Sequence, residues 1–168
     1  ASLLETTLKR MKMFVMRAQV TLDPVGAELV SFGLAGPDAA KLLRDAAGFA
    51  PTVVDGCETR NDITAIKISG PQPRFEIIAP TDTAKKLWDA FKNKATPVGP
   101  PVWQWLDIMA GIPSVVPETS EAFVPQIANL EIVGGVNFKK GCYPGQEIVA
   151  RMQYLGRLKQ RMYRAHFE

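Results

Sequence analysis

The chain has 168 residues, of which 46% are hydrophobic and 22% charged, with a formal net charge of +3. This composition predicts a folded body with one sizeable core, and no apolar run reaches the ~18 to 20 residues that a membrane span needs. Only two cysteines and one histidine are present, which disfavours a disulfide framework, a zinc site and a Ser-His-Asp triad.

The N-terminal residues do not read as a secretion signal, because Glu5, Lys9 and Arg10 interrupt the place of an apolar core. We therefore expect a cytoplasmic protein without membrane association and without a bound metal. The single histidine, His166, is expected to be an ordinary strand residue.

Positive charge is concentrated at the two ends of the chain. Residues 1–17 hold four bases and one acid, and residues 139–168 hold seven bases and two acids. Such ends can attract a polyanion such as RNA or a polyglutamylated cofactor, although a solvated basic edge is the simpler alternative. Direct RNA contact would use these residues: Arg151, Arg157, Lys159, Arg161 and Arg164, with Tyr154 and Tyr163.

Hydrophobic periodicity and turn residues predict alternating strands and helices. The expected elements are a helix over 3–16, a hairpin of 15–22 and 28–34, a helix over 39–48, a hairpin of 63–69 and 75–79, and a helix from 81 to about 94. This order favours an α+β sandwich, with helices on one face of a mainly antiparallel sheet.

The next part of the chain is less regular. Residues 98–105 predict a final strand or an extended lead into a helix, and in a strand Trp103 and Trp105 would share one side. From Gly111 onward, repeated prolines predict about thirty residues with little regular structure. Long irregular segments of this kind often carry function.

A cysteine lies between two glycines in the sequence Gly141-Cys142-Tyr143-Pro144-Gly145, directly before a predicted helix that begins at Gly145 or Gln146. Free N–H groups at a helix start and the nearby Lys139 and Lys140 stabilise a thiolate, so the pattern favours an activated thiol at Cys142. The alternative is a small apolar plug in a turn, followed by a surface pair of Glu147 and Arg151. Cys57, in a predicted loop between acids, is expected to have no such role.

The stretch from Lys140 to Glu147 resembles the K-G-C-Y-x-G-Q-E signature of the YgfZ family, which is related to the glycine cleavage T-protein within the aminomethyltransferase superfamily. Further short segments resemble sequences of the same family; they lie at residues 110–113, 123–126, 129–130, 134–138, 148–151 and 154–156. The resemblance covers about residues 106–161.

The resemblance implies a tetrahydrofolate-binding accessory protein that supports iron–sulfur cluster assembly or repair and, through it, tRNA modification. Folate, iron–sulfur proteins and tRNA-modifying enzymes are the implied partners, and the protein is not expected to be a classical enzyme. Cys142 carries over as the functional residue, within a signature loop of Lys140, Gly141, Tyr143, Gly145, Gln146 and Glu147. The side chains of Gln126, Asn129 and Arg151 are chemically suited to contact folate.

The resemblance also implies the domain organisation. Residues 1–105 would form the ferredoxin-like α+β subdomain of the aminomethyltransferase folate-binding fold, and residues 106–168 the extended segment, the signature loop and helix, and the start of a C-terminal strand region. Family members are about twice as long, so the sequence is expected to be a fragment. The alternative function is aminomethyl transfer to tetrahydrofolate, which the cysteine loop disfavours because that chemistry needs no thiol. T-proteins place a glutamate on the pterin where this chain has Met109.

Overall fold

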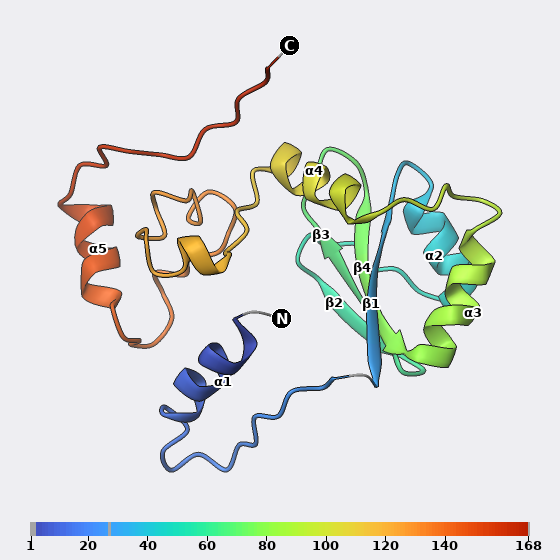
Figure 1. The fold of residues 1–168 in the computed structure, drawn as a ribbon, viewed down its shortest axis with the longest axis horizontal. Helices are drawn as coiled ribbons and strands as arrows, with labels where there is room; N and C mark the ends of the chain where they lie inside the picture. The colour runs from blue at the N-terminus through green and yellow to red at the C-terminus, as the bar shows by residue number, and fades with distance from the viewer. Residues whose placement is uncertain (1–2, 27, 168) are drawn as a thin grey trace. The chain divides into compact units, whose positions relative to one another are not determined.

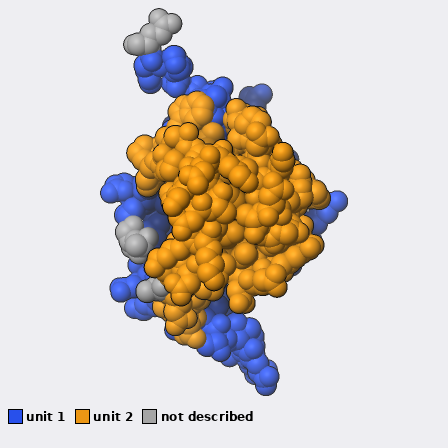
Figure 2. Space-filling view, turned by 90° about the vertical axis from the view of Figure 1, so that its right-hand side faces the viewer, with its two compact units in different colours: residues 1–22, 107–168 blue, residues 23–106 orange. Residues whose placement is uncertain are grey.

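The structure is a computed structural model that describes residues 3–26 and 28–167. Two compact units divide the chain, shown in blue and orange in Figure 2. Unit 1 comprises Ala1–Leu22 and Asp107–Glu168, and unit 2 comprises Asp23–Leu106.

Unit 2 is an α+β unit built on a four-stranded antiparallel sheet with the strand order β1-β4-β3-β2. Its elements, in chain order, are β1 (Leu29–Ala35), α2 (Ala39–Ala47), β2 (Cys57–Arg60), β3 (Ile63–Ile68), β4 (Arg74–Pro80) and α3 (Thr81–Phe91). Helices α2 and α3 lie on the same face of the sheet (Figure 1).

The core of unit 2 lies between the sheet and these two helices. On β4, Phe75, Ile77 and Ala79 are completely buried and alternate with partly exposed residues, as expected for a strand with one covered face. Leu43 of α2 and Leu87 of α3 contribute to the same core. Burial of each large apolar side chain stabilises the unit by about 1.5–3 kcal/mol.

The sequence predictions for this core are confirmed. The helices expected over 39–48 and from 81 onward form as α2 and α3, and the expected strands 28–34, 63–69 and 75–79 form as β1, β3 and β4. The short β2 was missed, because its charged residues do not alternate with apolar ones. Cys57 therefore begins a strand instead of lying in a loop.

The predicted hairpin of 15–22 and 28–34 is wrong. Residues 15–22 form turns and irregular chain, and Met16 has a φ of 41°, which interrupts an extended strand. Strand β1 pairs instead with β4, from Leu29 opposite Pro80 to Ala35 opposite Arg74.

Of the two alternatives for residues 98–105, the strand is wrong, and the segment instead leads into helix α4 (Pro100–Ala110). Proline is tolerated in the first turn of a helix, where its missing N–H would have no helical partner. Trp103 and Trp105 therefore do not share one side. The Trp103 ring lies directly against Gly33 of β1 and its centroid is 5.2 Å from the Arg74 guanidinium, whereas Trp105 is 54% exposed.

The two edges of the sheet differ in character. Strand β2 is short and carries Glu58 and Arg60, which form an ion pair at 3.3 Å. Strand β1 has seven residues without a charged side chain, and no strand in the described part of the chain pairs with its outer edge. A groove of about 890 Å³ follows β1 and is lined also by Trp88, Trp103 and residues 94–100.

Unit 1 contains little regular structure. Its elements are α1 (Leu4–Lys12), the end of α4, the 3-10 helix η1 (Pro117–Thr119) and α5 (Gln146–Tyr154). The expected N-terminal helix, the irregular proline-containing segment and the helix beginning at Gln146 are confirmed. In the described chain no helix is long and apolar enough to cross a membrane.

The start of a C-terminal strand region is not found, since residues 155–167 are irregular and His166 is not in a strand. A strand needs a ladder of hydrogen bonds to a neighbour. In the described part of this segment, one backbone bond to a distant residue is made, from the Met162 N–H to the Ile127 carbonyl at 2.8 Å.

Candidate functional site

A tight bend places the cysteine loop directly before α5. Gly145, the residue before the helix, has a φ of 84°, a left-handed conformation that glycine adopts without strain. The bend is closed twice by Gln146: its backbone N–H donates to the Tyr143 carbonyl at 3.1 Å, and its side-chain Oε1 accepts from the Tyr143 N–H at 3.3 Å. The sequence Tyr143-Pro144-Gly145-Gln146 thus encodes its own turn.

Cys142 is exposed at the start of this bend. The space beside the preceding residue is open as well, because a Cβ added to Gly141 would meet no atom within 4 Å. The thiol is therefore accessible to a reagent or a partner. In the described residues, no three His, Cys, Asp or Glu side chains come together in a way that could hold a metal ion.

The two lysines of the loop are held by local contacts. The Lys140 ammonium lies 4.5 Å from the centroid of the Tyr143 ring, a cation–π arrangement. The Lys139 backbone N–H donates to Asn137 Oδ1 at 2.8 Å. Both contacts join neighbours in sequence: the first positions the Lys140 charge and the second fixes the backbone at Lys139.

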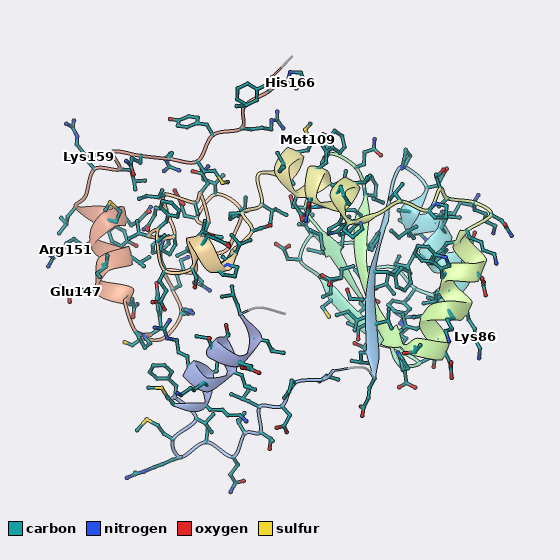
Figure 3. The ribbon with its side chains drawn as sticks, viewed as in Figure 1. Lys86, Met109, Glu147, Arg151, Lys159 and His166 are labelled. Atoms are coloured by element: carbon teal, nitrogen blue, oxygen red, sulfur yellow. The ribbon has the colours of Figure 1, made fainter. Side chains whose placement is uncertain are left out.

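Glu147 and Arg151 form the ion pair predicted from their spacing, with 3.0 Å between Oε1 and Nη2. Their side chains are 83% and 71% exposed and project outward from α5 (Figure 3). An exposed pair of this kind contributes only about 0.3–0.5 kcal/mol. The Arg151 guanidinium is therefore accessible to an anionic ligand at little cost.

Gln126 supports α5 from within. Its residue surface is completely buried, and Nε2 donates a 2.7 Å hydrogen bond to the Val149 carbonyl in the middle of the helix. The Oε1 atom is buried as well and accepts no hydrogen bond in the described part of the chain. This side chain links the irregular segment to the helix that follows the cysteine loop.

Asn129 links the same irregular segment to the C-terminal end of unit 1. Its Nδ2 donates to the Met162 carbonyl at 2.8 Å, and its Oδ1 accepts from Arg161 Nη1 at 3.0 Å. Gln126, Asn129 and Arg151, the residues expected to contact folate, are thus each engaged with a different partner.

Two arginine contacts were not anticipated from the sequence. Arg161 Nη2 lies 2.8 Å from Glu131 Oε1, and the two side chains are 35% and 12% exposed. Arg164 Nη1 donates to the Met109 carbonyl at 3.1 Å and lies 3.6 Å from its sulfur. No sequence pattern could reveal these pairs, because the Arg164 contact joins residues 55 positions apart.

These features define an α+β chain with an exposed cysteine in a glycine-bounded loop before a helix. No protein-family model matches the chain. It is 35% identical over 160 residues to the tRNA-modifying protein YgfZ of Colwellia psychrerythraea, covering 95% of this chain and 48% of the relative. The proteins of that name from Cronobacter sakazakii and Yersinia enterocolitica are 36% and 31% identical, each over 96% of this chain and 49% of the relative.

The chain therefore belongs to the YgfZ family. It spans about half the length of the curated relatives it matches.

Proposed function

We propose that the chain acts in tRNA modification as an accessory protein that binds tetrahydrofolate and supports iron–sulfur cluster assembly or repair, with Cys142 as its functional thiol. Relatives that are 31–36% identical carry the name tRNA-modifying protein, which supports the link to tRNA modification. The resemblance of the signature segment supports the folate and iron–sulfur parts of the proposal.

The accessible position of Cys142 is the observation that carries the proposal. A thiol that reacts or transfers a group must be reachable, and Cys142 is exposed in a loop whose bend is closed by Gln146. Iron–sulfur clusters are held by several ligands, so one cysteine is insufficient for a stable cluster. The chain would therefore act on a cluster together with a partner iron–sulfur protein.

One of the three expected folate contacts suits this ligand: the exposed Arg151 guanidinium suits the carboxylates of folate. The Gln126 side chain is completely buried and donates to the Val149 carbonyl, so it supports α5 from within. The Asn129 amide is engaged with Met162 and Arg161 instead. When bound, tetrahydrofolate would supply a carrier for one-carbon units.

The proposal includes the finer fold. We assign unit 2 to the ferredoxin-like subdomain of the aminomethyltransferase folate-binding fold, on the ground that α2 and α3 cover one face of its antiparallel sheet. The accessory role is favoured over aminomethyl transfer because that transfer needs no thiol, whereas this chain exposes Cys142 in its signature loop.

Complementation tests the role of the thiol. Cells that lack a YgfZ-type protein receive a full-length relative in which this chain replaces the matching half, with Cys142→Ala or Cys57→Ala. Mass spectrometry then measures an iron–sulfur-dependent tRNA modification. We expect Cys142→Ala to abolish rescue and Cys57→Ala, which removes the other exposed cysteine, to preserve it. Full rescue by Cys142→Ala would overturn the proposal.

Tetrahydrofolate binding is tested on the same chimera by isothermal titration calorimetry. Arg151→Gln should weaken binding by about tenfold, as expected for loss of one charge-assisted hydrogen bond. Arg44→Gln is the matched control, since Arg44 is also an exposed arginine in the last turn of a helix. Equal affinities of the two variants would remove Arg151 from the folate site.

A further inference from the structure

We propose that residues 139–167 of unit 1, called the basic region below, bind single-stranded RNA directly. The inference deepens the proposed function by naming a partner, and it rests on that function only for the choice of RNA among polyanions.

Charge is the first observation. The basic region contains seven bases and one acid, Glu147. By contrast, unit 2 contains nine bases and ten acids. A local excess of this size attracts phosphate groups and releases their counterions.

The four cations of residues 157–164 are of two kinds. Arg161 contacts Asn129 and Glu131. Arg164 donates to the Met109 carbonyl. Arg157 and Lys159 are exposed and form no ion pair in the described part of the chain. Lys159 projects away from unit 1 in Figure 3. These two side chains are positioned for phosphate contact.

The segment that carries them is held in place. The Met162 N–H donates to the Ile127 carbonyl and its own carbonyl accepts from Asn129 Nδ2, both at 2.8 Å. These two bonds, with the contacts of Arg161, fix an otherwise irregular segment against unit 1. A surface ordered before binding loses less conformational entropy when a ligand arrives.

Exposed tyrosines flank the free cations and favour RNA over an acidic protein. Tyr154, at the end of α5, is 70% exposed and Tyr163 is 85% exposed. The Tyr154 ring is oriented by an edge contact with Phe138, with 6.1 Å between centroids. Cations flanked by exposed aromatic rings match single-stranded nucleic acid, whose phosphates pair with the cations while its bases stack on the rings.

Fluorescence anisotropy tests the proposal with the 168-residue chain and a labelled oligouridine of about twelve nucleotides, a length within the usual site sizes. We expect the logarithm of affinity to fall linearly with the logarithm of salt concentration. The double variant Arg157→Gln/Lys159→Gln should reduce the slope by about 1.4, since each phosphate contact on a single strand contributes about 0.7. The control Lys85→Gln/Lys86→Gln removes the same charge from exposed residues of α3 and should leave the slope unchanged.

The tyrosines distinguish RNA from other polyanions. Tyr154→Leu or Tyr163→Leu should weaken binding roughly fivefold to hundredfold, whereas Phe123→Leu, an exposed aromatic of unit 1 outside the basic region, should not. Unchanged RNA affinity in both tyrosine variants would overturn the assignment to RNA. The same holds if Lys85→Gln/Lys86→Gln reduces the salt slope as much as Arg157→Gln/Lys159→Gln does. Every variant in this titration keeps Cys142, and complementation measures the thiol function separately, so failure here is separable from failure of the proposed thiol function.

Discussion

The buried side-chain amide of Gln126 donates a 2.7 Å hydrogen bond to the backbone carbonyl of Val149, 23 residues further along the chain. Val149 is itself only 7% exposed and lies in the middle of α5. Through this bond the irregular segment holds the helix whose start bears the cysteine loop. The loop therefore depends on a residue far from it in sequence.

Replacing Gln126 should loosen α5. Gln126→Ala removes the hydrogen bond and leaves a cavity, and we expect it to destabilise unit 1 by about 2–4 kcal/mol. Gln126→Met keeps the volume and also removes the buried Oε1, so the expected loss is about 1 kcal/mol, the net contribution of one hydrogen bond. Hydrogen exchange of the α5 amides measures both. The exposed Gln153→Ala in α5 is the control, and a loss equal to that of Gln126→Ala would contradict the anchoring role.

The two glycines of the cysteine loop should respond differently to alanine. Gly145 has a φ of 84°, so Gly145→Ala places a side chain in a left-handed conformation and should cost about 1–2 kcal/mol. Gly141→Ala meets open space and its φ lies outside the left-handed range, so its effect should stay within about 0.5 kcal/mol. Hydrogen exchange of the α5 amides again reports both changes. A larger loss of stability for Gly141→Ala than for Gly145→Ala would contradict the claim that the bend depends on the left-handed conformation of Gly145.

Two substitutions at Glu147 should test whether its negative charge stabilises the first turn of α5. Glu147→Gln loses an exposed ion pair and should lower helix stability by a few tenths of a kcal/mol. Glu147→Lys adds repulsion from Arg151 and a positive charge in the first turn, for an expected loss of about 1 kcal/mol. The difference between the two variants should shrink in about 1 M salt, where the screening length is about 3 Å. A salt-independent difference would point to packing instead.

The contact between Gly33 and Trp103 predicts an intolerant position in unit 2. A Cβ at residue 33 would overlap the Trp103 ring, so Gly33→Ala must displace the ring and should cost about 1–3 kcal/mol. Gly26→Ala, where a Cβ meets nothing within 4 Å, is the control. All three tryptophans lie in unit 2, so tryptophan fluorescence during urea unfolding reports this unit. Equal urea midpoints for Gly33→Ala and Gly26→Ala would contradict the close contact between Gly33 and Trp103.

The elements that the sequence predicted are those with strong periodicity. Phe75, Ile77 and Ala79 alternate along β4, and α2 ends at a glycine, Gly48, with a φ of 80°. Where periodicity was weak, the prediction failed. For residues 98–105 a strand and a lead into a helix both stayed open, and the first turn of a helix accepts the two prolines at 100–101.

The site was predictable only as far as it is local. The bend at Gly145, the helix start at Gln146 and the pair of Glu147 and Arg151 all join residues within a few positions. The hydrogen bonds of Gln126 with Val149 and of Asn129 with Arg161 join residues 23 and 32 positions apart. Such contacts depend on tertiary packing, which a single sequence does not reveal.

The contrast between the two sheet edges has a consequence for handling the protein. Charged residues on β2 discourage a second sheet from adding to that edge, whereas the uncharged β1 has no such protection. Aggregation of concentrated samples should therefore begin at β1. A lysine in place of Ser31, whose hydroxyl contacts Glu76, would act as a gatekeeper that keeps the chain in solution.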